Sequence, residues 1–394
     1  MKHAFFLTTA VALTLPAFAG AHELRYRLVV ADSEAPQISV LDVGADTDPM
    51  TFEIASPARV HLGPDGRHAW AVQGEAGVVQ VLDTGLIEED HGDHSALILE
   101  APALLPGSAT GERPVHFNMD DDTVAIFWDG SGTATLHENA TAASGDLSAH
   151  ATIDTGKPHH GVAVPVGDHM LITLPPEGEG LPDALAVVGA DGAEMSRVDC
   201  LNLHGEGKAG GFIAFGCQDG VAIFDTSQTP PTGRFVAYPD DAPEGGMVRL
   251  LLSPRDTLAL VGNFGTDHLT IFDPSAESGD FTFVASPVPG MAFALNDSGM
   301  EGFSILSDGR LVHFSALTGR ILGEATGIVG PYAMERGVIR PMMDVTGDRV
   351  AISDPAAGQV VLVDTDTLEV VDRIDVGNAP RSLLILAAEA EHIH

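Results

Sequence analysis

Short apolar runs alternate with polar turns along the whole chain, and the pattern recurs about every 42 to 55 residues. Each unit opens with an apolar strand, passes through a turn rich in Gly, Pro and Asp, and continues with a second apolar strand. Examples are SPARVHLGPDGRHAWAV, GKPHHGVAVPVGDHMLIT and GMVRLLLSPRDTLALVG. Third strands such as GVAIFDTSQ and fourth strands such as GRFVAYP follow. A repeat of this length with four short strands is typical of one blade of a β-propeller.

The first strands of the units lie near residues 60, 116, 160, 204, 249, 292, 340 and 382, which predicts eight blades, or seven if one repeat is drawn wrongly. The amino-terminal LRYRLVVADS, QISVLDV and TFEIASP lack an inner partner, whereas the carboxyl-terminal APRSLLIL is an inner strand without the other three. Pairing them completes a blade and removes an exposed sheet edge. We predict an all-β, eight-bladed β-propeller in a single domain over residues 22–394, with insertions near 86–113 and 137–150.

The first residues have the features of a secretory signal peptide. Lys2 precedes an apolar run that is too short for a comfortable membrane span, and small residues follow it. We expect residues 1–21 to be removed, with cleavage after Ala19 or Ala21, and the protein to be exported to the periplasm without membrane insertion. In that oxidising compartment Cys200 and Cys217 predict a disulfide, with thiolate metal ligation as the alternative.

The chain is strongly acidic, with 19 Lys and Arg residues against 56 Asp and Glu residues and a formal net charge of −37. Such a surface repels nucleic acid and anionic lipid and concentrates cations. Solubility or adaptation to salt is the simpler explanation. We expect no nucleic-acid partner and a monomer. Four arginines, Arg59, Arg249, Arg340 and Arg381, recur near the starts of inner strands. They can bind an anionic group or pair with carboxylates, and we favour pairing.

Several histidines occupy equivalent places in successive repeats. Counting back from the turns aligns His61, His116 and His204, and aligning Pro114 with Pro158 brings His160 level with His116. Equivalent positions of neighbouring blades meet around the channel. Three consecutive blades are therefore expected to bring His116, either His159 or His160, and His204 to one end of it, with His61 on the blade before.

Converging imidazoles suit Zn(II), which favours tetrahedral nitrogen and oxygen ligation. The fourth ligand is then water, Glu112, Glu206 or Asp120. The alternative is that each histidine only hydrogen-bonds within its sheet. Three or four histidines in register favour the metal site.

A second candidate metal cluster lies in EEDHGDHS, within the first insertion. His91, Asp93 and His94 share a glycine-containing loop, and such a segment can capture a cation and release it, because ordering the loop weakens the net affinity. A solvated acidic loop is the equally weighted alternative.

Taken together, the acidic exported propeller, the His-Gly-Asp-His loop, KPHHG and LNLHGEG resemble the AztD family, periplasmic zinc metallochaperones that accompany a bacterial zinc ABC transporter. The resemblance implies that the protein holds Zn(II) and passes it to the solute-binding protein of such a transporter, and that it is not an enzyme. Two other classes stay open: a metal-dependent propeller hydrolase or lactonase, and a non-catalytic interaction scaffold. GxSxG, phosphate-loop and CxxCH motifs are absent from the sequence.

Overall fold

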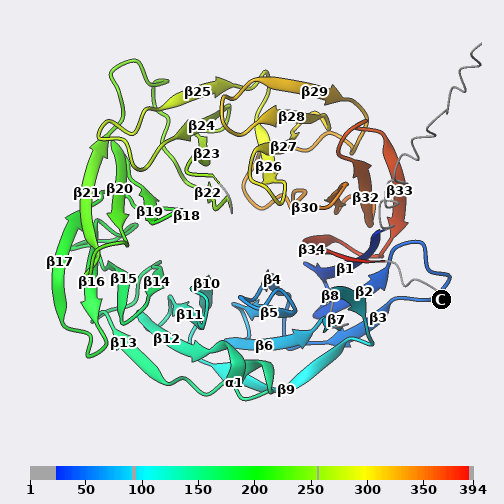
Figure 1. The fold of residues 1–394 in the computed structure, drawn as a ribbon, viewed down its shortest axis with the longest axis horizontal. Coiled ribbons are helices and arrows are strands. Elements are labelled where there is room, and N and C mark those ends of the chain that lie inside the picture. Colours follow the sequence, from blue (N-terminus) through cyan, green and yellow to red (C-terminus); the bar gives the residue numbers. More distant parts are fainter. Residues whose placement is uncertain (1–23, 91–94, 255–256, 390–394) are drawn as a thin grey trace, which may run out of the picture.

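Eight four-stranded sheets surround a central axis in the computed structural model, which describes residues 24–90, 95–254 and 257–389 (Figure 1). Neighbouring strands within each sheet are antiparallel, and the first strand of each repeat lies nearest the axis. The prediction of an eight-bladed propeller is therefore confirmed.

Each blade consists of four strands that follow one another from the axis outward. From the inner to the outer strand, blades 1 to 4 are β34 (Pro380–Glu389), β1 (Leu24–Asp32), β2 (Gln37–Asp42) and β3 (Met50–Glu53); β4 (Arg59–Leu62), β5 (His68–Gln73), β6 (Val78–Asp83) and β9 (Ala103–Thr110); β10 (Pro114–Met119), β11 (Thr123–Trp128), β12 (Thr133–Glu138) and β13 (Ala151–Asp154); and β14 (Ala163–Val166), β15 (His169–Leu174), β16 (Ala184–Gly189) and β17 (Glu194–Asp199). Blades 5 to 8 are β18 (Glu206–Ala209), β19 (Phe212–Gly216), β20 (Gly220–Asp225) and β21 (Thr232–Ala237); β22 (Leu251–Leu252), β23 (Leu260–Phe264), β24 (His268–Phe272) and β25 (Thr282–Ala285); β26 (Gly290–Leu295), β27 (Glu301–Leu306), β28 (Leu311–Ser315) and β29 (Ile321–Ala325); and β30 (Met343–Thr346), β31 (Arg349–Asp354), β32 (Gln359–Asp364) and β33 (Val370–Asp375).

Blade 1 joins the two ends of the described chain. Its carboxyl-terminal strand β34 pairs with β1 over nearly the full length of both, from Leu24 opposite Glu389 to Asp32 opposite Pro380. Both edges of β1 are thereby hydrogen-bonded, because β2 takes the other side. The closure predicted from the unpaired end segments is confirmed, and it removes the edge that an open ring would expose.

The apolar core lies between neighbouring blades. The second and third strands of a blade contact other blades on both faces, so β5 is buried at every position, whereas the outer strand β33 is mostly exposed. Trp70, Val124 and Trp128 pack between blades 2 and 3, and Leu28 and Leu362 pack between blades 8 and 1. This packing explains why the second and third strands of the repeats are the most apolar.

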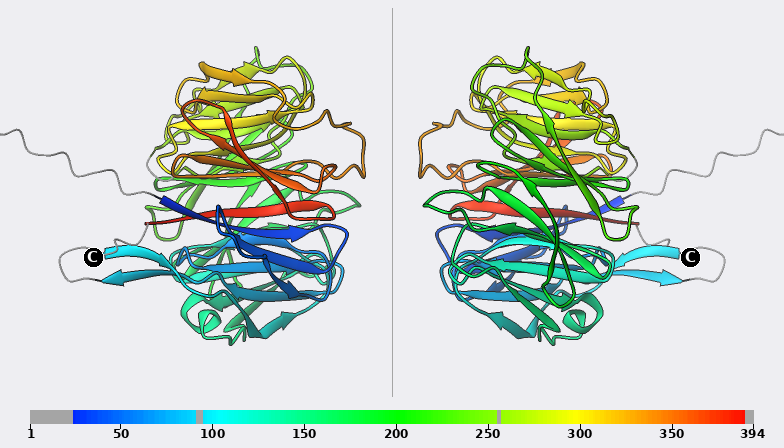
Figure 2. Two further views of the ribbon diagram at one scale, coloured as in Figure 1. Left: turned by 90° about the vertical axis from the view of Figure 1, so that its right-hand side faces the viewer. Right: turned by 90° about the vertical axis from the view of Figure 1, so that its left-hand side faces the viewer.

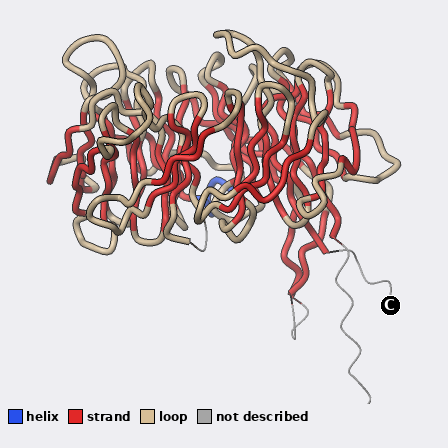
Figure 3. Tube along the Cα trace, turned by 90° about the horizontal axis from the view of Figure 1, so that it is seen from above, coloured by secondary structure: helices blue, strands red, loops and turns tan. Residues whose placement is uncertain are grey.

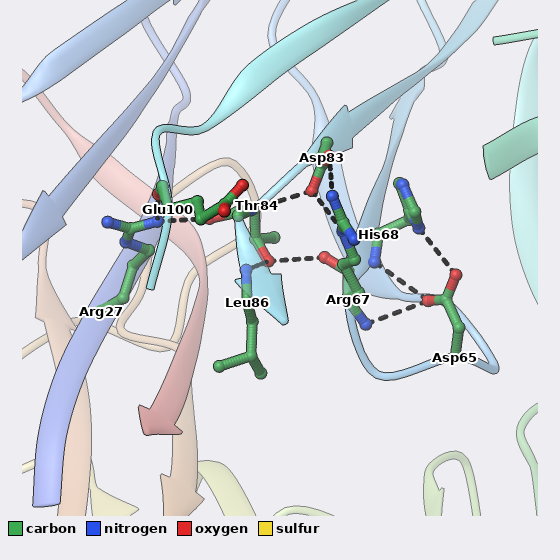
Figure 4. A network of polar contacts seen from close by, with 9 residues as sticks. Arg27, Asp65, Arg67, His68, Asp83, Thr84, Leu86 and Glu100 are labelled. Atoms are coloured by element: carbon green, nitrogen blue, oxygen red, sulfur yellow. Dashed lines mark hydrogen bonds and ion pairs between the residues drawn. The ribbon is translucent and has the colours of Figure 1, made fainter. Parts of the chain in front are cut away.

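The first insertion forms a hairpin of β7 (Leu86–Asp90) and β8 (Ser95–Leu99) that projects from one face of the disc (Figures 2 and 3). Its base is fastened by the buried guanidinium of Arg27, which donates to the carbonyl oxygens of Thr84 and Glu100, both at 2.6 Å (Figure 4). Asp42 neutralises Arg27 from the other side at 2.6 Å. Both ends of the hairpin are thus tied to blade 1.

The second insertion carries the short helix α1 (Asn139–Ala143). Among the described residues, no helix has the length and apolar character needed to cross a membrane.

The predicted disulfide between Cys200 and Cys217 is confirmed, and both cysteines are buried. Cys200 directly follows β17 and Cys217 directly follows β19, so the bond ties the end of blade 4 to blade 5. The segment between them contains the first two strands of blade 5, β18 and β19.

Replacing both cysteines by serine should lower the free energy of unfolding by about 3 kcal/mol, because the bond closes a loop of 17 residues in the unfolded chain. Chemical denaturation of the variant and of the wild type, each with and without reductant, measures the difference. Equal unfolding midpoints for oxidised wild type and variant would contradict a stabilising bond.

Candidate metal site

The eight blades surround the channel (Figure 1), and because each repeat follows the same chain path, the starts of the inner strands lie at one end of it. His116 lies near the start of β10, His160 precedes β14, and His204 precedes β18. These are consecutive blades, and the structure brings the three rings together. His116 Nε2 lies 3.2 Å from His160 Nε2, and the ring centroids of His160 and His204 are 5.5 Å apart.

Local backbone irregularities place each ring. A bulge between Pro114 and His116 breaks the ladder with β11, and bulges of this kind re-aim side chains. Gly161 follows His160, and a Cβ atom at position 161 would lie only 2.4 Å from the ring of Phe127. Gly205 follows His204 with φ of +80°, and a Cβ there would lie 2.5 Å from the Arg249 oxygen. A side chain at either position would clash with its neighbours, which explains why a glycine follows each of these two histidines.

His159 and His160 contact different neighbours, although they are adjacent in the sequence. His159 is buried, with its Nδ1 3.0 Å from the Lys157 oxygen and its Nε2 3.2 Å from Thr173 Oγ1. The side chain of His160 is 31% exposed and faces His116. Of the two adjacent histidines, His160 is the one with a ring nitrogen free to take a metal.

All three clustered histidines direct Nδ1 at an oxygen. His160 Nδ1 lies 2.7 Å from Asp129 Oδ2, and His204 Nδ1 lies 2.8 Å from the Arg249 carbonyl oxygen. His116 Nδ1 lies 3.4 Å from Glu206 Oε1. These acceptors favour the tautomer with the proton on Nδ1, which leaves a lone pair on each Nε2. Two Nε2 lone pairs that face each other repel unless a proton or a cation lies between them.

The spacing of His116 and His160 suits a shared metal ion. Two nitrogen ligands of one tetrahedral zinc, each at about 2.0–2.1 Å, lie about 3.3 Å apart, and the observed separation is 3.2 Å. Within the described ranges, however, no three His, Cys, Asp or Glu side chains are already arranged to hold a metal ion. Binding therefore requires the third ligand to move, and His204 is the neighbouring imidazole.

Glu206 supplies the negative charge beside the rings. Its side chain is 16% exposed, and its Oε1 accepts a hydrogen bond from Asn118 Nδ2 at 2.9 Å. Burial opposes its ionisation, but His116, the Asn118 hydrogen bond and His204 together outweigh burial and lower the pKa of Glu206. Burial also acts to lower the pKa of His116, yet the charge and hydrogen bond of Glu206 prevail and raise it. Burial lowers the pKa of His204.

His61 lies next to this group but faces another neighbour. Its ring stacks on Phe117 with centroids 5.0 Å apart, and its Nε2 is buried without a hydrogen-bond partner in the described part of the chain. Burial, followed by the charge of Arg59, lowers the pKa of His61 to about 4, so the ring is neutral. A ligand role for His61 stays a prediction.

The predicted second cluster of His91, Asp93 and His94 lies outside the described residues. The hairpin that leads to it packs at the far end of the channel, where Leu86 and Ile87 line a cavity with Ala387 and Ala388 from the end of β34. The hairpin and the three clustered histidines therefore occupy opposite faces of the disc.

Sequence reasoning missed Asp129, which orients His160. The residue ends the apolar strand TVAIFW of the preceding blade, and its side chain is only 3% exposed. A carboxylate directly after the apolar run TVAIFW was the available signal, since a charge next to a buried strand needs a partner. The contact of His204 with the Arg249 carbonyl oxygen could not be predicted from the sequence, because every residue type has a backbone carbonyl.

Comparison with known proteins agrees with this architecture. No protein-family model matches the chain. The zinc chaperone AztD of Citrobacter koseri is 26% identical over 383 residues, which are 96% of this chain and 90% of that protein. Its crystal structure superposes with a TM-score of 0.86 at 26% identity and covers 94% of this chain and 100% of that one.

The structure of apo AztD from Citrobacter koseri gives a TM-score of 0.84 at 25% identity over 93% of this chain and 99% of that one. The dihydro-heme d1 dehydrogenase NirN, at 14% identity and a TM-score of 0.58 over 91% of this chain and 74% of that one, shares the fold alone. Because the AztD matches extend over nearly the whole chain in both sequence and structure, this protein is related to the zinc chaperone AztD.

Proposed function

We propose that this protein is a periplasmic metallochaperone that binds Zn(II) through His116, His160 and His204 and passes it to the solute-binding protein of a zinc ABC transporter. The observation that carries the proposal is the common orientation of the three rings, with every Nδ1 directed at an oxygen acceptor and Nε2 left as the metal-binding atom. The relation to the zinc chaperone AztD supports the choice of metal and role.

The geometry suits transfer rather than permanent retention. His160 is 31% exposed at the end of the channel, so an incoming ligand can reach the metal from that side. The third ligand is not prearranged, which lowers net affinity because binding must order it. Zinc can then leave by stepwise ligand exchange, with each departing imidazole replaced by a group of the acceptor.

A metal-dependent hydrolase is the competing function, since it would use the same ligands around a catalytic ion. Such an enzyme needs a general base whose pKa lies near the working pH. Of the two carboxylates beside the rings, Asp129 is held by His160 Nδ1 at 2.7 Å, and the pKa of Glu206 is lowered instead. This favours a charge-balancing role for Glu206 in a carrier.

Replacing His116, His160 and His204 together by alanine should weaken zinc binding at the channel by at least about a hundredfold, because the three nitrogen donors are lost. Competition with a zinc-binding dye measures the affinity of each protein. His150→Ala, at an exposed histidine, is the matched control and should behave as wild type. Unchanged high-affinity binding by the triple variant would overturn the assignment.

Asp129→Asn should weaken zinc binding by about 10–100-fold without removing a ligand, because the carboxylate orients His160 and increases its basicity. The same competition assay gives the affinity, and transfer to the solute-binding protein should become faster as retention weakens. Wild-type affinity in a correctly folded Asp129→Asn protein would show that this contact does not support the site.

Zinc affinity should fall as the pH drops below about 6, since a protonated imidazole cannot bind a metal. Glu206 raises the pKa of His116 and burial lowers that of His204, so the His116 ring takes up its proton at a higher pH than the His204 ring. Affinity measured between about pH 7.5 and 5.5 should therefore decline steadily toward the acidic end. A flat profile over this range would argue against imidazole ligation.

A further inference from the structure

A cavity of about 280 Å³ lies between blades 6 and 7, whereas the three clustered histidines come from blades 3, 4 and 5. Leu250, which precedes β22, and Gly290, which begins β26, both line it. The cavity therefore lies toward the end of the molecule at which the inner strands start. The inner strand of blade 6 is short here, because β22 has only two residues. This cavity is separate from the proposed zinc site.

Most of the cavity wall is apolar. Leu269 and Val284 from blade 6 and Phe293 from blade 7 line it, and all three side chains are only partly buried. Phe314, which also contributes to the wall, belongs to the buried apolar cluster between the same blades. Apolar surface of this kind favours an apolar ligand, because binding removes hydrocarbon from water. A concave apolar wall with a few polar groups is typical of small-molecule sites.

Several polar side chains in the wall already have partners in the protein. The hydroxyl groups of Ser286 and Ser304 donate to backbone carbonyl oxygens at 2.7 Å and 3.3 Å. Glu324 accepts a hydrogen bond from Arg310 at 2.9 Å, so its negative charge is balanced at the rim. His268 Nδ1 lies 3.0 Å from the carboxylate of the preceding aspartate. These groups leave the cavity without an uncompensated negative charge.

Arg340 is the charged side chain of the wall that differs. The sequence favoured carboxylate partners for Arg340 and for the other three arginines near inner-strand starts. None of the four forms an ion pair within the described residues, where five other arginines do. The polar contact of the Arg340 guanidinium is with Met334 Sδ at 3.7 Å, and a thioether is a weak acceptor. Acidic residues outnumber basic ones 56 to 19, so a shortage of carboxylates does not explain this.

Arg340 and Met334 both come from the loop of residues 326–342, which connects β29 to β30. This loop, orange in Figure 2, projects from the face opposite to the β7–β8 hairpin. It is fastened to blade 7, because the Tyr332 amide donates to the Ser307 carbonyl oxygen at 2.8 Å. The loop thus adds a cation to a cavity whose other walls come from two sheets.

We propose that this cavity binds a small apolar carboxylate, with the carboxylate group on Arg340 and the hydrocarbon part against the apolar wall. A guanidinium group binds a carboxylate through paired, charge-assisted hydrogen bonds. The volume of about 280 Å³ equals that of about nine water molecules at about 30 Å³ each. A ligand of about ten non-hydrogen atoms, such as octanoate, matches this space. Binding does not require zinc.

Isothermal titration calorimetry on the chelator-treated mature protein tests the proposal, with octanoate as the probe. The wild type should bind octanoate saturably at one site. Arg340→Gln should weaken this binding at least about tenfold, because the charge-assisted hydrogen bonds are lost. Arg381→Gln is the matched control, since it removes the same charge from another arginine near an inner-strand start that does not line the cavity, and it should bind as wild type.

Two further probes need no variant. Neutral octanamide should bind the wild type at least about tenfold more weakly than octanoate, because it lacks the charge. Butyrate should also bind at least about tenfold more weakly, because its shorter chain covers less of the apolar wall. Non-saturating heats with octanoate, equal affinities for octanoate and octanamide, or equal octanoate affinities in the Arg340→Gln and Arg381→Gln proteins would overturn the proposal. None of these outcomes bears on zinc binding.

Discussion

The pairing of β34 with β1 is the constraint on which the rest of the molecule depends, because it joins the two ends of the described chain within one sheet. With the ring closed, every blade has a neighbouring blade on each side (Figure 1). Because the repeats follow the same path, all eight inner strands begin at the same end of the channel. Residues about 44 positions apart can then meet, as His116 and His160 do. The pairing of β34 with β1 thus helps to position the histidine site, although neither strand contributes one of the three clustered histidines.

The three imidazoles are oriented by acceptors of different strength. Asp129 is a buried carboxylate, Glu206 a partly buried one at longer distance, and the third acceptor is a backbone carbonyl. These three acceptors hold the nitrogen donors of the imidazoles near one another, but not in the tetrahedral arrangement that a bound zinc ion needs. A carrier needs this compromise, since a complete and rigid site would hold its metal too long for exchange with an acceptor.

Much of the architecture was predictable because propeller repeats leave strong marks in sequence. The unpaired strands at the two ends predicted the closure, and the cysteine pair predicted the disulfide. The histidine register predicted that His116 and His204 approach the same place. It could not choose between His159 and His160, because the segment before β14 is irregular and only packing against Phe127 and Thr173 decides which ring turns inward. The repeat also aligned His61, whose ring stacks on Phe117, and its role as a ligand stays a prediction.

We propose that one zinc ion binds between His116, His160 and His204 through their Nε2 atoms. Anomalous diffraction at the zinc edge from zinc-loaded crystals tests it directly. The account predicts a peak about 2.0–2.1 Å from each of the three Nε2 atoms, with His204 rotated toward the other two rings. A zinc peak elsewhere, with these three nitrogens uncoordinated, would contradict it.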